Sequence, residues 1–215
     1  MPGSACGYIG PGSPSTGVSK HYFTVFDVPG LPGGAELLLV GAHRDSKPTD
    51  PRNCAQRAGQ AAVLADLVHK HRKGRHVVLL GDFNDFDGAT PDASGNTPTS
   101  SVMRQFEKLG LKNVASNVPV DERWTWASDG ERHPRAALDH VLVSESLAPL
   151  VEDVSVGRLD REASDHRPVV QAANGWRGAE RNLRYLRRFR RGGKRRGGRS
   201  GIRGRASGAA SSPSV

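Results

Sequence analysis

Asp82 and Asn84 are the two residues whose types and spacing point most directly to chemistry. They follow the apolar run Val77–Leu80, which predicts a buried strand ending at the rim of a site. Residues two apart on a strand point to one face, so we expect the carboxylate and the amide to project together. Such a pair suits metal-assisted phosphoryl chemistry, in which the carboxylate orients water or holds a cation and the amide stabilises oxyanion charge.

Three further segments carry the same kind of signal. An apolar run ends in His43, a second segment joins Asp139 and His140 to an apolar strand, and a third places Asp165 and His166 before another apolar stretch. His140 should point to the opposite face of its strand from Asp139, so we predict a packing role for it. The order of the four segments, acid or histidine at each strand end, indicates one composite site.

These segments together resemble the endonuclease/exonuclease/phosphatase superfamily of metal-dependent phosphodiesterases, over about residues 22–170. The resemblance implies an α/β fold of the layered sandwich type and hydrolysis of ester bonds. It also implies a divalent cation, Mg²⁺ first, with Mn²⁺ or Ca²⁺ as alternatives. Deoxyribonuclease-like, abasic-site endonuclease-like and sphingomyelinase-like members keep the substrate class open.

Residue roles follow from the resemblance. Asp82 would position or deprotonate the attacking water or contact the metal, and Asn84 would hydrogen-bond a phosphate oxygen. His166, oriented by Asp139, would contact the scissile phosphate. The set implied as catalytic is His43, Asp82, Asn84, Asp139 and His166, and the set implied as metal ligands is Asp82 and Asp165.

The substrate-binding set adds Lys47 and Trp126 to Asn84 and His43. Arg44 is a further candidate for phosphate contact, although basic side chains near a turn are commonly only solvated. We expect Trp124 and Trp126 to share one strand face, where packing competes with stacking on a base. A polar strand end made of turn-forming side chains is the alternative for Asp82 and Asn84.

The superfamily's first half normally supplies an Asn and a metal-holding Glu. Upstream of His43 the acids are Asp27 and Glu36, both in segments that resemble the second half. We therefore expect the C-terminal half only, hence an incomplete sandwich. This predicts a gene fragment, or a chain completed by the missing N-terminal half or a second chain, with activity impaired.

The elements that must position these residues are readable from periodicity. Strands are predicted at residues 23–28 and 36–42 as a hairpin, then at 76–80, 124–126, 137–143, 151–156 and 168–171. Helices are predicted at residues 53–72 and 101–109, where apolar side chains recur every three or four positions. Strands with a few helices predict an α/β class.

Charge divides the chain. Residues 177–215 hold 13 basic residues and one Glu, whereas residues 1–176 hold 18 basic and 21 acidic residues. We predict a disordered or loop segment at 1–18, a partial superfamily domain at 19–176 and a disordered Arg/Gly-rich tail at 177–215. The basic tail favours nucleic acid, and an anionic membrane is the alternative. Its clustered residues are Arg187, Arg188, Arg190, Arg191, Lys194, Arg195 and Arg196.

Two functions from other classes stay open. One is a non-catalytic nucleic-acid-binding protein with a degenerate domain and a functional tail, and the other is a sphingomyelinase- or phosphoinositide-type phosphodiesterase. Cys6 and Cys54 match no metal spacing and indicate no disulfide framework, though one disulfide is compatible with them. No signal peptide or membrane-spanning stretch is recognisable, so the cytoplasm is the default expectation and the compartment is unknown.

Overall fold

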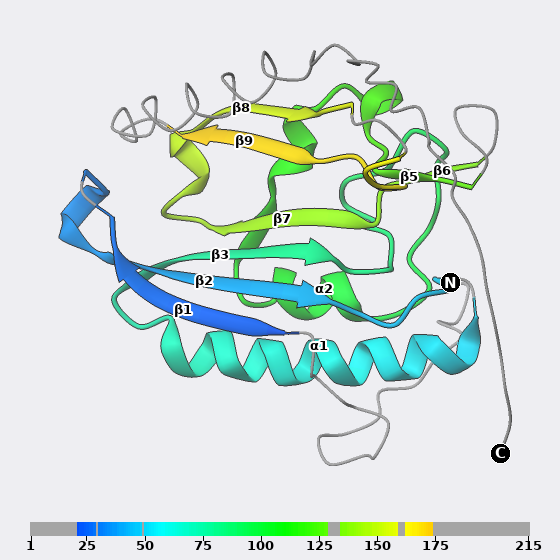
Figure 1. Ribbon diagram of the computed structural model, residues 1–215. Coiled ribbons are helices and arrows are strands. Elements are labelled where there is room, and N and C mark those ends of the chain that lie inside the picture. Colours follow the sequence, from blue (N-terminus) through cyan, green and yellow to red (C-terminus); the bar gives the residue numbers. More distant parts are fainter. Residues whose placement is uncertain (1–20, 29, 49, 129–133, 159–161, 174–215) are drawn as a thin grey trace, which may run out of the picture. The chain divides into compact units, whose positions relative to one another are not determined.

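A five-stranded sheet forms the centre of the computed structural model, which describes residues 21–28, 30–48, 50–128, 134–158 and 162–173 (Figure 1). Across the sheet the strands run in the order β1-β2-β3-β7-β4. Their bounds are Tyr22–Asp27 for β1, Glu36–His43 for β2, Arg75–Asp82 for β3, Asp139–Ser144 for β7 and Leu111–Asn113 for β4. β2 and β3 are parallel, and every other neighbouring pair is antiparallel. The ends of β2 and β3 therefore meet the start of β7 at one edge.

Two helices cover one face of this sheet. α1 (Pro51–His71) makes the crossover between β2 and β3, and α2 (Val102–Glu107) lies beside it (Figure 1). α1 begins where Asp50 accepts the backbone N–H of Arg52 at 2.9 Å, with proline in the first turn. The apolar side chains of both helices and the sheet form one core cluster, which includes Leu38, Val40, Leu64, Leu79 and Phe106.

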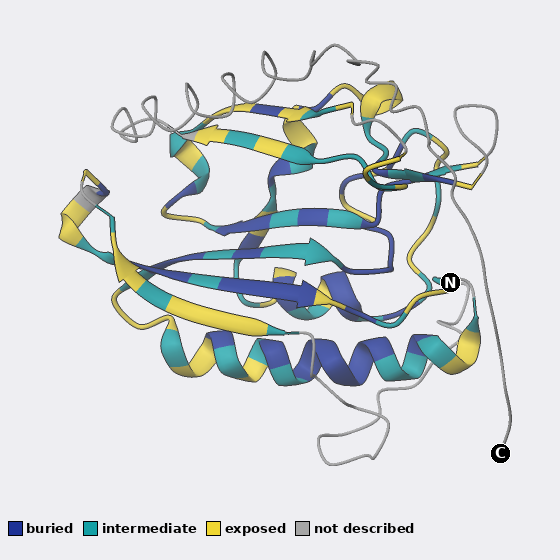
Figure 2. Cartoon of the chain, viewed as in Figure 1, coloured by how far each residue is buried: buried dark blue, intermediate teal, exposed yellow. Residues whose placement is uncertain are grey.

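The opposite face packs against a two-stranded sheet of β8 (Val151–Val156) and β9 (Val169–Ala173). A second cluster of buried residues lies there, built from Leu37, Val143, Val154 and others. β1, at the edge of the central sheet, is mostly exposed (Figure 2). The mixed α/β class is therefore confirmed, but among the described residues the two accompanying sheets have two strands each and no second large sheet is present.

Short elements complete the described chain. β5 (Trp126–Ala127) pairs with β6 (Arg135–Ala136), and 3₁₀ turns span Pro32–Gly34, Val114–Asn117, Val120–Glu122 and Ala148–Leu150. The sequence patterns predicted neither β4 nor β6, because two or three residues are too few to show a period. Both helices and the hairpin of β1 and β2 lie close to their predicted ranges.

The expectation that Trp124 and Trp126 share a strand face is wrong. β5 begins only at Trp126, and the Trp124 ring lies between the guanidinium groups of Arg135 and Arg167, at 4.8 and 4.0 Å from its centroid. Two stacked cations hold this ring, and it faces a small pocket away from Trp126. Packing therefore explains Trp124, whereas Trp126 lines the larger pocket described below.

Three predictions fall on residues outside the described ranges: the segment 1–18, the tail from residue 177 and its seven clustered basic residues. Contacts divide the chain into the units Met1–Trp176 and Arg177–Val215. Cys54 on α1 is buried and disulfide-bonded, and Cys6 lies outside the described residues. Within those residues, no helix combines the length and apolarity needed to span a bilayer.

Candidate active site

The sheet register places three of the predicted residues in one row. His43 on β2 pairs with Asp82 on β3, and Asp82 pairs with Asp139 on β7. The Nε2 atom of His43 lies 3.8 Å from Oδ2 of Asp82. Gly81 permits this arrangement, because a Cβ at that position would lie 1.9 Å from the carbonyl oxygen of Ala42 and the backbone φ is +134°.

Asp82 and Asn84 do lie together, but by a different route from the one predicted. β3 ends at Asp82, and Asn84 turns out of the strand with a φ of +48°. The Asp82 carboxylate accepts the Asn84 backbone N–H at Oδ1 and the Asn84 amide at Oδ2, both at 2.9 Å. The Asn84 amide also donates to the carbonyl of Arg44 at 3.1 Å. Both amide hydrogens of Asn84 are therefore already used.

His166 is held by Asp139 through its Nδ1 atom, 2.6 Å from the carboxylate Oδ2. The segment around His166 is fixed to β5, since Arg167 donates its backbone N–H to Thr125 at 2.7 Å. Thr125 is buried, and its hydroxyl accepts the backbone N–H groups of Leu138 and Asp139. One threonine thus connects the strand that carries Asp139 with the segment that carries His166.

Electrostatics move two pKa values in this site upward. The hydrogen bond that His166 donates to Asp139 raises the pKa of His166 above its usual value, and the charges of Asp139, Asp82 and Asp165 add to that effect. Burial raises the pKa of Asp82, with the Asp139 charge as the second cause. The imidazole is consequently biased toward its charged form, and the Asp82 carboxylate becomes a stronger base.

One pocket of about 560 Å³ gathers most of the predicted residues. Its lining includes His43, Lys47, Asp82, Asn84, Trp126, Asp165 and His166. Asp139 is not in the lining and contacts His166 from behind. Trp126 donates its indole N–H to Asp165 at 3.3 Å. Apolar side chains, among them Phe86 and Leu138, supply another wall of the pocket.

Arg44 does not serve as the phosphate contact considered from sequence. It is 2% exposed, and its guanidinium packs over the rings of Phe83 and Phe106 at 4.4 and 4.9 Å from their centroids. None of its three guanidinium nitrogens has a hydrogen-bond partner among the described residues. Burial lowers the pKa of Arg44 to about 9. Its position one residue after a strand end directs it into the core.

His140 is buried, in agreement with its predicted packing role. Its Nδ1 lies 3.0 Å from the Asn113 amide and its Nε2 lies 3.0 Å from the carbonyl of Asp85. The Asn113 amide donates to Nδ1, and the Nε2–H donates to the carbonyl of Asp85. Asp85 itself is fully buried and accepts hydrogen bonds from Thr99 and Ser100. Asp85 is thus part of the scaffold beneath the site.

Sequence reasoning missed three buried polar residues around the pocket, Arg57, Gln60 and Asp92, and the half-buried Thr99. Arg57 and Gln60 lie on the buried face of α1, and a charged residue amid alanines was the signal available. The Asp92 carboxylate accepts three backbone N–H groups and the amide of Asn96, which lines the pocket. These residues shape the pocket without contacting its centre.

The described residues do not complete a metal site. No group of three or more His, Cys, Asp or Glu side chains in the described ranges is arranged to hold an ion. Both oxygens of Asp82 accept hydrogen bonds from Asn84, and Oδ2 of Asp165 accepts one from Trp126. Two carboxylates line the same pocket, yet the remaining ligands that a divalent cation requires are not assembled.

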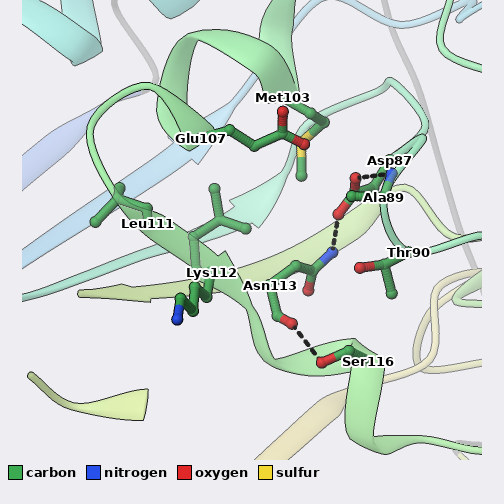
Figure 3. Close-up of a pocket in the computed structure, with 10 residues that line it drawn as sticks. Asp87, Ala89, Thr90, Met103, Glu107, Leu111, Lys112, Asn113 and Ser116 are labelled. Atoms are coloured by element: carbon green, nitrogen blue, oxygen red, sulfur yellow. Dashed lines mark hydrogen bonds between the residues drawn. The ribbon is translucent and has the colours of Figure 1, made fainter. Parts of the chain in front are cut away.

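A second pocket, of about 270 Å³, lies between α2 and β4 (Figure 3). Asp87 in this pocket accepts the backbone N–H of Ala89 and the amide of Asn113, both at 2.9 Å. None of the residues predicted to be functional lines it. The larger pocket is therefore the candidate active site.

Comparisons with known proteins agree with this geometry. The model of the Endonuclease/Exonuclease/phosphatase family matches residues 9–166. The match lies in the N-terminal part of the chain, so the expectation of a C-terminal half only is not borne out. No curated protein sequence matches the chain.

Two solved structures share the fold at low sequence identity. The 3′ phosphatase NExo from Neisseria, bound to product DNA hairpin, aligns with a TM-score of 0.51 and 20% identity, covering 74% of this chain and 72% of that one. The 3′-5′ exonuclease NExo from Neisseria meningitidis aligns with a TM-score of 0.50 and 22% identity over the same shares. With the family match over most of its length, the chain belongs to the endonuclease/exonuclease/phosphatase family.

Proposed function

We propose that this chain hydrolyses phosphoester bonds in nucleic acid. The observation that carries the proposal is the 2.6 Å hydrogen bond between His166 and Asp139 beside Asp82, at the mouth of one pocket. A charged imidazole and a basic carboxylate at one spot form a general acid and a general base. Membership of the family supports a hydrolase that acts on phosphoester bonds.

In this proposal Asp82 accepts a proton from the attacking water. The water oxygen forms a bond to phosphorus, and the bond between phosphorus and the leaving oxygen breaks. His166 donates a proton from Nε2 to the leaving oxygen, because Nδ1 is committed to Asp139. The raised pKa values of both groups favour these directions of proton transfer.

Substrate contacts in the proposal come from Lys47, His43 and Asn84. Lys47 and His43 are exposed at the pocket rim and would pair with nonbridging oxygens of the phosphate. Asn84 would exchange its hydrogen bond with Asp82 for one with a phosphate oxygen, since no amide hydrogen is otherwise free. Trp126 offers its ring to a base or another apolar group of the substrate.

The metal assignment belongs to the proposal as well. Enzymes of the family generally use divalent cations, and Asp82 and Asp165 are the proposed ligands, with Mg²⁺ ahead of Mn²⁺ or Ca²⁺. The described residues do not complete such a site, so no step above depends on the ion. A cation would have to draw further ligands from substrate phosphate and water.

Nucleic acid is the proposed substrate for two reasons. One neighbour is described as bound to a product DNA hairpin. Residues 177–215 concentrate 13 basic residues, a composition that binds phosphate backbones through counterion release. No observation supports the membrane-lipid substrate or the second chain considered from sequence.

The test uses the purified full chain with supercoiled plasmid and with an oligonucleotide that carries a 3′ phosphate, each with Mg²⁺. Nicking or phosphate release should fall at least about 100-fold in His166→Ala, the usual loss for a general acid. His69→Ala, at an exposed position on α1, is the matched control and should keep full activity. Binding of the plasmid without any turnover would instead favour the non-catalytic nucleic-acid-binding protein.

A further inference from the structure

Arg57 binds the backbone of the loop that forms one side of the pocket. Arg57 is fully buried on α1. Its Nη1 lies 3.0, 3.4 and 3.5 Å from the carbonyl oxygens of Lys47, Ser46 and Asp45, and its Nη2 donates to the carbonyl of Pro48 at 2.8 Å. One guanidinium therefore holds four successive carbonyl groups.

A second side chain of α1 fixes the same loop. Gln60, one turn after Arg57, accepts the backbone N–H of Asp45 at 3.3 Å. Asn53, one turn before Arg57, donates its amide to the carbonyl of Ser46 at 2.8 Å. Side chains of one helix face thus bind four carbonyl groups and one N–H group of the loop.

The backbone that these residues hold is strained at Lys47, whose φ is +63°. A residue other than glycine in this region persists only where its surroundings impose it. With the carbonyl groups turned inward to Arg57, the side chains of Ser46 and Lys47 are exposed and line the pocket. The helix therefore fixes the backbone from which the Lys47 side chain extends.

Thr99 ties the loop to the strand-end segment on the other side of the pocket. Its hydroxyl donates to the carbonyl of Pro48 and lies 3.2 Å from Nη2 of Arg57. Its backbone N–H donates to Asp85 at 3.0 Å. Asp85 also balances the buried charge of Arg57, whose pKa burial lowers and the Asp85 charge raises. Asp85 directly follows Asn84. The loop that carries Lys47 and the segment that carries Asp82 and Asn84 are therefore connected by the same buried hydrogen bonds.

We infer that Arg57 is a positioning residue that presents Lys47 to the substrate phosphate in a preformed loop. The inference rests on the proposed function for the identity of the group that Lys47 meets. Arg57 uses two nitrogens to reach the four carbonyl groups, Nη1 for three of them and Nη2 for the fourth, which a lysine at the same position cannot do with a single nitrogen. The positive charge alone is therefore insufficient for this role. Arg57→Lys keeps the positive charge but removes the second hydrogen-bonding nitrogen.

The kinetic test is a double-mutant cycle with Arg57→Lys and Lys47→Ala on the phosphodiester substrate. Each single variant should raise KM about tenfold, the usual cost of one charge-assisted contact, and leave kcat within about twofold. The double variant should resemble Lys47→Ala alone. Arg75→Lys, at the opposite end of β3 and paired with Glu36, is the control and should leave KM unchanged. Independent, multiplying effects on KM would overturn the inference.

A second readout does not depend on turnover. Hydrogen exchange of the backbone amides in residues 44–47 should accelerate at least about tenfold in Arg57→Lys, while Lys47→Ala and Arg75→Lys leave it unchanged. If Arg57→Lys does not fold, Gln60→Met removes the hydrogen bond from the Asp45 backbone N–H and should accelerate the same amides. Exchange that stays at the wild-type rate in a folded variant would refute the positioning role.

Failure of the proposed function would look different. A wild-type chain without turnover would refute the hydrolase, and the Kd of a fluorescent single-stranded oligonucleotide would then replace KM in the same cycle. Nonadditive Kd values with accelerated exchange would support the role of Arg57 in a binding protein. Normal turnover together with additive effects of the two substitutions on KM would support the hydrolase and refute the positioning role of Arg57.

Discussion

Removing the charge of Asp139 should lower the stability of this protein at low pH and have almost no effect at high pH. Asp139→Asn keeps the size of the side chain and an oxygen that can accept the N–H of a neutral His166. What it removes is the attraction between the carboxylate and the charged imidazole. The pKa of His166, raised chiefly by its hydrogen bond with Asp139, should fall toward its ordinary range.

The magnitude follows from the exposure of the pair. A hydrogen bond to a charged group contributes about 1.5 to 3 kcal/mol. The side chains of His166 and Asp139 are 28% and 23% exposed, so we expect the lower value, about 1.5 kcal/mol. The folded-state pKa of His166 is raised, so this stabilisation is fully present below the unfolded pKa of about 6.5 and is lost as pH rises through the folded value.

The assay is urea unfolding of wild type and variant at pH 5.5 and pH 9, in buffer with EDTA. The wild type should be about 1.5 kcal/mol more stable at pH 5.5, and the difference should nearly vanish at pH 9. Glu36→Gln is the control, because it breaks a carboxylate pair with Arg75 that involves no histidine. Its effect should be equal at both pH values. A pH-independent difference for Asp139→Asn would refute the reasoning.

Three other changes test separate parts of the structure. Gly81→Ala should prevent stable folding, because its Cβ would meet the Ala42 carbonyl. Gly74→Ala, at a φ of +73° with open space around the new Cβ, should cost only about 1 to 2 kcal/mol in thermal unfolding. Arg44→Met should raise the free energy of unfolding by about 1 to 3 kcal/mol at pH 7, because it removes a buried charge without hydrogen bonds. That gain should shrink above the Arg44 pKa of about 9, where wild type loses the charge. Deletion of residues 177–215 should weaken DNA binding and flatten its salt dependence in anisotropy titrations; unchanged binding would exclude the tail from it.

The sequence patterns were most informative where one strand was buried on both faces. The runs before His43 and Asp82 predicted β2 and β3 because parallel central strands are continuously apolar. The helix between them was equally clear, and together they place both strand ends at one edge. The pairing of Asp82 with Asp139 was not predictable, because nothing local records which strands are neighbours.

The positions that departed from expectation all depend on contacts between distant segments. Asn84 leaves the strand because its amide bonds to the carbonyl of Arg44, 40 residues earlier. The side chain of Arg44 enters the core because two phenylalanines accommodate its cation. Arginine on a helix is usually solvated, yet the side chain of Arg57 is buried because four loop carbonyl groups accept its hydrogen bonds. In each case a tertiary partner overrides a local pattern.

The charges around the pocket explain why His166 is central to the proposed chemistry. Among the described residues, three carboxylates line or adjoin the pocket, from Asp82, Asp139 and Asp165, against the two basic side chains Lys47 and Arg135 in its lining. A phosphate entering there meets an excess of negative charge unless an imidazole is protonated. The carboxylates that repel phosphate are the same groups that raise the pKa of His166. The carboxylates of the site therefore keep His166 protonated, and the protonated imidazole attracts the phosphate. Phosphate affinity should consequently decline as pH rises through the His166 pKa.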